Sequence, residues 1–234
     1  MVLQHLHDDG PGYLGEWLDG QGVSWAAVCA EAGEAYPESV LGCRGLAVLG
    51  GAWSANDDRP SLRHAEALIR EADAAGIPVI GHCLGGQLLA KALGGRVERM
   101  AVPEIGWHAI THNGSAAARA WLGNPPDATV YQWHQDSFVD LPPGAEALAS
   151  SPACAHQAFA IRQHLGMQFH IEITPAKIGA WLAQAGDSLE ALAQGHPGSV
   201  QAIEAMHAAT QRCQAGSEAL ARCIYGAWRD RWRS

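Results

Sequence analysis

The most informative segment of the chain is Val79-Ile80-Gly81-His82-Cys83-Leu84-Gly85-Gly86-Gln87-Leu88-Leu89. Its first residues are apolar and typical of a buried strand, and an amphipathic helical pattern starts directly after Cys83. A Gly-x-Cys-x-Gly turn between strand and helix is the arrangement of a nucleophile elbow, with sulfur in place of the serine oxygen. Side chains at Gly81 and Gly85 would collide with the adjacent backbone, which explains the glycines. The pattern therefore predicts a nucleophilic thiol at Cys83, although a cysteine merely buried in a tight turn is the structural alternative.

Short apolar runs alternate with helical patterns on both sides of this stretch. The strands expected in this half of the chain are Val2–Leu6, Val23–Cys29, Gly45–Leu49 and Ile77–Ile80, and the helices are Tyr13–Asp19, Pro60–Ala75 and Leu84–Leu93. Strands that alternate with helices are joined by right-handed crossovers into a parallel sheet covered on both faces. The first half of the chain therefore predicts an α/β fold.

The pattern changes after residue 95. We expect partly antiparallel strands at Arg96–Thr111 and Gln157–His170, the latter folded as a hairpin across Gln163–Gly166. A helix at Ser115–Leu122 and a strand at Thr129–Trp133 lie between them. From Pro175 the chain is rich in alanine and helical, with breaks near Gly186 and at Gly195–Gly198. We therefore predict one domain over residues 1–174, with residues 175–234 as a helical C-terminal extension of the same domain.

Composition narrows the classes of partner. The 234 residues are 48% apolar and 17% charged, the balance of a globular protein. A formal net charge of -9 argues against a nucleic-acid partner, and the basic cluster at the C-terminus is explained as a solvated helix end. No apolar stretch is long enough to span a membrane. Met1–His5 opens no signal peptide, so we expect a cytoplasmic protein.

Cysteines and histidines do not form a recognisable metal motif. The six cysteines are scattered singly, which is typical of reduced thiols rather than a disulfide framework. His5 and His7 would share a face only in a strand, and the sequence has no His-Glu-x-x-His motif. We read this segment as a strand end entering a polar loop, and we expect neither a metal nor a cofactor.

A thiol nucleophile needs a base, and His170 is the best candidate among twelve histidines. It ends an apolar run in Gly166-Met167-Gln168-Phe169-His170-Ile171-Glu172. A carboxylate two residues along the chain can hold the imidazole tautomer and stabilise the imidazolium that forms when the thiol proton is taken. The pattern thus predicts a Cys83, His170 and Glu172 triad.

Taken together, these motifs resemble the class I glutamine amidotransferase family, over about residues 1–175. That family has a Gly-x-Cys-x-Gly-x-Gln elbow and a His-x-Glu motif late in the domain, which here are Gly81–Gln87 and His170–Glu172. Leu49-Gly50-Gly51 followed by Trp53-Ser54 is similar to its oxyanion loop, and Trp133–Asp136 resembles a segment of the GMP-synthetase-like branch. The chain departs from the family pattern at Ala52, in place of proline, and at Gln135, in place of glycine.

The resemblance implies a flavodoxin-like three-layer sandwich with a mostly parallel central sheet and a small antiparallel portion. It implies that Cys83 attacks the γ-amide of glutamine or a γ-glutamyl compound, and that a γ-glutamyl thioester forms while ammonia or an amine leaves. The Gly51 and Leu84 amides would stabilise the oxyanion. Gln87 and Gln135 would bind the substrate's amino-acid end.

Several alternatives stay open at this point. The sequence has no Gly-x-x-x-x-Gly-Lys-Ser/Thr motif for binding ATP. Either a separate synthetase subunit therefore receives the ammonia, or the protein is a free-standing hydrolase that releases it into solution. A dienelactone-hydrolase-like cysteine esterase shares the elbow but needs its acid well before its histidine. A catalytically inactive, amidotransferase-like binding protein is the third reading. Trp53, Trp107 and Trp133 either pack in the core or line a pocket wider than glutamine needs.

Overall fold

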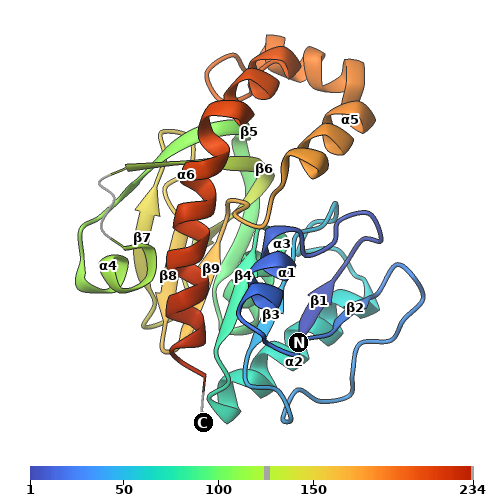
Figure 1. Ribbon diagram of the computed structural model, residues 1–234, viewed down its shortest axis with the longest axis vertical. Coiled ribbons are helices and arrows are strands. Elements are labelled where there is room, and N and C mark those ends of the chain that lie inside the picture. Colours follow the sequence, from blue (N-terminus) through green and yellow to red (C-terminus); the bar gives the residue numbers. More distant parts are fainter. Residues whose placement is uncertain (124–126, 233–234) are drawn as a thin grey trace.

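The computed structural model describes residues 1–123 and 127–232, within which nine strands form one mixed sheet (Figure 1). The order of the strands is β2-β1-β3-β4-β9-β8-β7-β5-β6. The parallel half contains β1 (Val2–Gln4), β2 (Ala27–Cys29), β3 (Leu46–Val48), β4 (Val79–His82) and β9 (His164–Met167). The antiparallel half adds β5 (Arg96–His112), β6 (Asp127–Asp140), β7 (Glu146–Ser150) and β8 (Ala158–Ile161).

Helices cover both faces of this sheet. They are α1 (Tyr13–Gly20), α2 (Pro60–Ala75), α3 (Leu84–Ala92), α4 (Ala116–Leu122), α5 (Pro175–Gly195) and α6 (Ile203–Arg229). Residues of α1, α4 and α6 share one core cluster, and residues of α2 and α3 share another. Side chains of one strand alternate between the faces: Val79 joins the α2 and α3 cluster, and Ile80 joins the other. The predicted three-layer α/β fold is confirmed.

The antiparallel half is larger than the small portion predicted from the sequence. The strand expected at Thr129–Trp133 is the middle of β6, which has 14 residues and pairs with the 17 residues of β5. Sequence reasoning missed β7 altogether. Its five residues, Glu-Ala-Leu-Ala-Ser, have low strand propensity, and pairing with β8 on one side and β5 on the other holds them extended.

The hairpin expected within Gln157–His170 exists, but its predicted turn is wrong. The strand β9 starts at His164, and the turn lies at Arg162 and Gln163, where Arg162 has a φ of 53°. Gly166, which suggested a turn, lies inside β9. A Cβ there would lie 2.2 Å from the Phe159 ring, so the packing of this ring requires glycine at that position.

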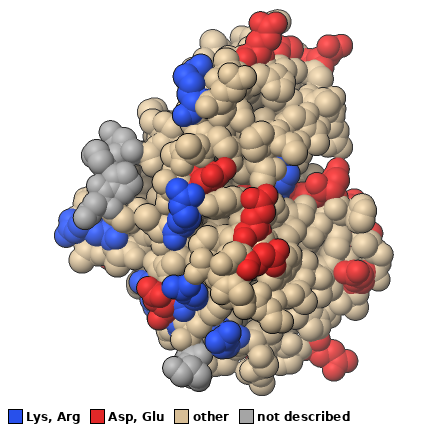
Figure 2. All heavy atoms as spheres, viewed as in Figure 1, with Lys and Arg blue, Asp and Glu red and all other residues tan. Residues whose placement is uncertain are grey.

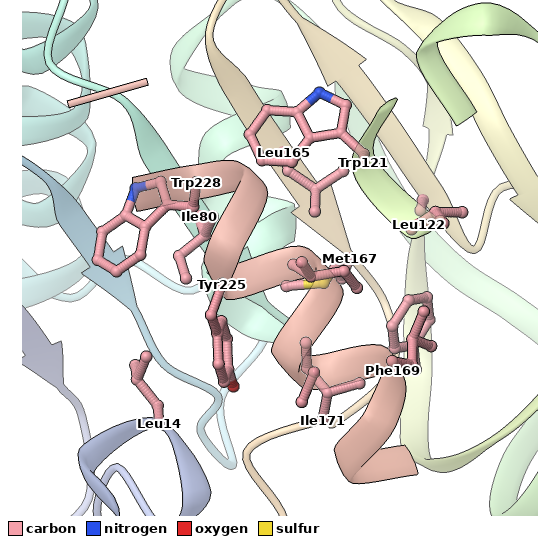
Figure 3. Close-up of a cluster of buried hydrophobic side chains, with 14 of the residues drawn as sticks. Leu14, Ile80, Trp121, Leu122, Leu165, Met167, Phe169, Ile171, Tyr225 and Trp228 are labelled. Carbon is pink, nitrogen blue, oxygen red and sulfur yellow. The ribbon is translucent and has the colours of Figure 1, made fainter. Parts of the chain in front are cut away.

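The C-terminal helices follow the predicted pattern. Gly186 interrupts α5 with a φ of 47°, and α6 starts after the break at residues 196–202. Figure 3 shows Tyr225 and Trp228 of α6 packed with Leu14, Ile80, Met167 and other side chains of the sheet core. This shared core supports our proposal that residues 175–234 extend the domain of residues 1–174. Among the described helices, none is both long and apolar enough to cross a membrane.

Candidate active site

Cys83 occupies the single residue between β4 and α3. Its φ of 48° and ψ of -109° are strained for a residue with a side chain, and its amide donates to Met167 O at 2.9 Å, which ties the turn to β9. The turn leaves no room at its glycines: a Cβ at Gly81 would lie 2.4 Å from Gly85 O, and one at Gly85 would lie 2.0 Å from Val48 O. The sheet therefore fixes the thiol at the N-terminus of α3.

Two polar groups contact the sulfur. Cys83 Sγ lies 3.8 Å from Trp133 O, and the side-chain amide of Gln168 donates toward Sγ at 3.7 Å. Both are within reach of a weak hydrogen bond to sulfur. Gln168 lies between β9 and His170 and had no sequence signal of its own.

His170 and Glu172 form a buried pair next to the elbow. His170 Nδ1 lies 2.5 Å from Glu172 Oε1, so the other ring nitrogen, Nε2, is the one available to the thiol. The Nε2 atom is buried and makes no hydrogen bond with any described residue. His170 was expected to end a strand, but β9 ends at Met167, and a bridge from the His170 amide to Tyr131 O at 2.9 Å holds the segment instead.

The electrostatics of the pair favour an imidazolium and a carboxylate. Burial opposes the charged form of His170, but the Glu172 carboxylate, with a contribution from Cys83, outweighs burial and raises the pKa of His170 to about 10. Burial also opposes ionised Glu172, but His170 and then His82 outweigh it and hold the pKa of this carboxyl well below its usual range. The pair therefore places a cationic imidazole beside the candidate nucleophile.

A second histidine contacts the Glu172 carboxylate of this pair. The sequence did not predict this contact. His82 Nε2 lies 4.0 Å from Glu172 Oε2 and 3.3 Å from the hydroxyl of Tyr225 in α6. All three side chains are fully buried. Burial lowers the pKa of His82, and the Glu172 carboxylate opposes this shift. The C-terminal helix is thereby connected to the site through one hydroxyl.

The predicted oxyanion residues lie together. A Cβ at Gly51 would lie 2.9 Å from Leu84 Cδ2, and a Cβ at Gly50 would lie 2.9 Å from His170 Cε1, so the loop after β3 packs directly on the elbow and the histidine. This loop packs closely on Leu84 and His170 although it contains Ala52 in place of proline. Both Gly51 and Leu84 line a cavity that Cys83 also lines.

The predicted substrate-binding residues line the same cavity, which has a volume of about 290 Å³. The buried side chain of Gln87 donates to Asp136 O at 3.0 Å. Gln135 is exposed and accepts a hydrogen bond from Arg99. The Asp136 carboxylate accepts from Ser54 Oγ at 2.6 Å. One wall of the cavity therefore presents amide, guanidinium and carboxylate groups together.

A second cavity, of about 650 Å³, also has Cys83 in its lining. The two cavities share Cys83, Trp53 and Trp133, but His170 lines only the larger one. Trp107, the third tryptophan expected near the site, is instead buried and donates to Thr210 Oγ1 at 3.0 Å. The larger cavity also contains side chains that the sequence gave no reason to place there: Asp8, Asp9, Glu31, Trp181 and Gln184.

The side chains of His5 and His7 differ in their surroundings. His5 is buried, its Nδ1 lies 2.9 Å from Tyr36 OH, and burial lowers its pKa to about 4, whereas His7 is exposed. Within residues 1–123 and 127–232, no group of three or more His, Cys, Asp or Glu side chains is arranged to hold a metal ion.

The fold and the site define an α/β protein with a cysteine at a strand-to-helix elbow. The model of the family described as "Glutamine amidotransferase class-I" matches residues 26–185, and the chain belongs to this family. It is similar along its length to a crystal structure of a glutamine amido transferase from Methylobacillus flagellatus, with a TM-score of 0.94, 34% identity, and coverage of 100% of this chain and 94% of that one. A glutamine amidotransferase from Thermotoga maritima has a TM-score of 0.87 at 25% identity, covering 98% and 96% of the two chains.

Curated relatives match over a shorter region. The GMP synthase [glutamine-hydrolyzing] of Staphylococcus carnosus is 38% identical over 106 residues, which is 44% of this chain and 20% of that protein. The chain thus matches about a fifth of the length of this relative. The predicted membership of the class I glutamine amidotransferase family is confirmed. The roles of individual residues are proposals.

Proposed function

We propose that this protein hydrolyses the γ-amide of glutamine or of a γ-glutamyl compound, with Cys83 as nucleophile, His170 as base and acid, and Glu172 as orienting group. The observation that carries the proposal is the buried His170–Glu172 pair at 2.5 Å beside a thiol held at a strained elbow. Membership of the class I glutamine amidotransferase family supports the choice of an amide substrate.

The first step forms the acyl-enzyme. The Cys83 thiolate attacks the γ-carbonyl carbon, a C–S bond forms, and the amide hydrogen-bond donors of Gly51 and Leu84 stabilise the oxyanion. The C–N bond then breaks as His170 Nε2 gives its proton to the leaving nitrogen. Loss of one such oxyanion donor commonly costs roughly 3 kcal/mol of transition-state stabilisation.

The second step returns the enzyme to its starting state. Water attacks the γ-glutamyl thioester, His170 accepts its proton, and the C–S bond breaks to release glutamate. Glu172 keeps Nδ1 protonated throughout, so that Nε2 faces the reacting atoms in both steps. In the smaller cavity, Gln87 and Gln135 bind the substrate's amino-acid end.

Two competing functions are less well supported. A dienelactone-hydrolase-like esterase would place its acid before its histidine, whereas Glu172 follows His170 and pairs with it. An inactive binding protein would have no need for a buried histidine–carboxylate pair beside a cysteine at a strained elbow. The fate of the nitrogen is a separate question, and relatives named GMP synthase suggest a separate ammonia-accepting synthetase subunit as one answer.

Ammonia release by the purified chain tests the proposal. We expect it from glutamine, and we expect Cys83→Ala to lower kcat/KM by at least about a thousandfold, the effect of removing a nucleophile. Cys223→Ala, at an exposed position of α6, is the matched control and leaves the rate unchanged. A Cys83→Ala variant that keeps the wild-type rate overturns the proposal. Activity that needs an added synthetase favours the subunit alternative.

A further inference from the structure

The larger cavity beside Cys83 is far bigger than the departure of ammonia requires. Its volume of about 650 Å³ falls in the range of sites that hold a whole small molecule, on the order of 300–1,000 Å³. In the proposed function the smaller cavity, which contains Gln87 and Gln135, binds the glutamyl end. Cys83 lines both cavities, so a substrate whose carbonyl lies at Sγ extends from one cavity into the other.

The position of His170 identifies the larger cavity as the leaving-group side. His170 lines this cavity and not the smaller one, and it is only 2% exposed. Its Nε2 atom has no hydrogen-bond partner among the described residues. A nitrogen that is protonated there departs into the larger cavity.

Aromatic rings form much of the wall. Trp181 of α5 packs edge-on against His170, with ring centroids 5.1 Å apart, and against Trp133, with centroids 5.6 Å apart. Trp53, from the loop after β3, also lines the cavity, and the Arg59 guanidinium carbon lies 3.9 Å from the centroid of its ring. Lys177 Nζ lies 5.4 Å from the centroid of the Trp181 ring, so cations of the protein already lie over both of these tryptophans. The exposed parts of such rings contact alkyl chains well.

The charges on the wall are negative. Asp8 and Glu31 are exposed carboxylates of the lining, and Glu31 is held in place because it accepts a hydrogen bond from His7 N at 2.8 Å. The third carboxylate, Asp9, is neutralised by Lys177 Nζ at 2.6 Å. The described lining contains no lysine or arginine. Figure 2 shows acidic side chains beside the notch between α5 and the part of the molecule that carries β1 and β2.

We propose that the larger cavity binds the leaving amine of a γ-glutamyl amide, and that this amine carries an alkyl chain with a second, positively charged group. The inference rests on the proposed function and specifies its substrate class. The tryptophans contact the alkyl chain, Asp8 and Glu31 attract the distal cation, and His170 protonates the scissile nitrogen. Products are glutamate and a free diamine, with water as the only co-reactant.

Three matched γ-glutamyl amides test this substrate class: those of diaminopropane, propylamine and β-alanine, which end in a cation, a methyl group and an anion. Glutamine is the fourth substrate. We expect kcat/KM to be highest for the diaminopropane amide, by about tenfold over the propylamine amide, because two exposed carboxylates attract its distal cation. We expect the β-alanine amide to be the poorest. Added salt should reduce this preference.

A double variant separates charge from shape. Asp8→Asn with Glu31→Gln should lower the ratio of kcat/KM between the diaminopropane and propylamine amides by at least about fivefold, because the attraction for the cation is lost. Glu38→Gln, at an exposed carboxylate outside the cavity, is the control and should leave the ratio unchanged. Circular dichroism and the propylamine amide rate report whether the double variant folds.

Each remaining outcome overturns the inference. If the propylamine or β-alanine amide matches the diaminopropane amide, the cavity does not select a cation. Hydrolysis of glutamine alone overturns the substrate class but leaves the proposed function standing. If no substrate is cleaved and a glutamine-derived electrophile does not label Cys83, the proposed function fails and this inference fails with it.

Discussion

His170 Nδ1 and Glu172 Oε1 lie 2.5 Å apart and are closed off from solvent, in a segment that belongs to no strand. A main-chain bridge to Tyr131 on one side and the contact of His82 with Glu172 on the other position this pair. Because the acid follows its histidine by only two residues, one short segment delivers both groups to the elbow. The thiol comes separately, from the junction of β4 and α3.

Removing the negative charge of Glu172 tests the role of this pair. Glu172→Gln keeps the shape of the side chain but leaves His170 without its carboxylate, so the pKa of His170 should fall from about 10. We expect kcat to decrease by roughly a hundredfold to ten-thousandfold, as in other triads that lose their acid. Steady-state kinetics and the NMR titration of His170 measure both effects. Glu218→Gln on α6 is the control, and a variant within twofold of wild type would show that Glu172 does not orient the base.

The stability of the protein should depend on pH through His170. Its pKa is raised from 6.5 to about 10 by folding, so the stabilisation it contributes is fully present below pH 6.5 and is lost as the pH rises through about 10. The difference in free energy of unfolding between the wild type and His170→Asn should therefore shrink between these two pH values. Urea denaturation at intervals of one pH unit measures it. A difference that stays constant over this range would contradict the pKa assignment.

The hydroxyl of Tyr225 should act on the site from α6. Tyr225→Phe removes the group that lies 3.3 Å from His82 Nε2, and we expect a loss of stability of about 1 kcal/mol, the usual net value of one hydrogen bond. If His82 positions Glu172, the alkaline limb of the profile of kcat against pH should also shift. Tyr13→Phe, near the protein surface, is the control and should leave the profile in place. An unchanged profile for Tyr225→Phe would limit the hydroxyl to a structural role.

Two glycine substitutions test how tightly the elbow is packed. Gly85→Ala places a Cβ 2.0 Å from Val48 O and should destabilise the protein by at least about 3 kcal/mol, because backbone on both sides must move. Gly179→Ala, in α5 with no atom within 4 Å of its Cβ, should stabilise by about 0.5–1 kcal/mol. Urea denaturation of both variants gives the comparison. Equal effects at the two positions would contradict the elbow geometry.

The parts of the fold and site that could be predicted from the sequence are those with local signals. The elbow from Val79 to Leu89 and the pair His170 and Glu172 are short motifs whose geometry follows from neighbouring residues. The sequence predicts the hairpin turn at Gln163–Gly166, partly because glycine is common in turns. In the structure Gly166 lies inside β9, where packing against the Phe159 ring requires a glycine. That requirement arises from tertiary packing, which has no signature at the turn itself.

The larger cavity shows the same limit at the site. Asp8, Glu31 and Trp181 come from the loop after β1, the loop after β2 and helix α5, and only the folded chain brings them together. The contact from Tyr225 to His82 joins residues separated by 143 positions. Spacing in the sequence cannot indicate such contacts. The predicted cytoplasmic location and the absence of a cofactor stay predictions.

We propose that Cys83 is the nucleophile that attacks the γ-carbonyl carbon of a γ-glutamyl group. The most direct test of this proposal is to incubate the wild type and Cys83→Ala with a glutamine-derived diazo-ketone and to measure the intact mass of each protein. We expect one covalent adduct on the wild type, located at Cys83 by peptide mapping and prevented by excess glutamine, and no adduct on Cys83→Ala. Equal labelling of the two proteins, or an adduct confined to another cysteine, would contradict it.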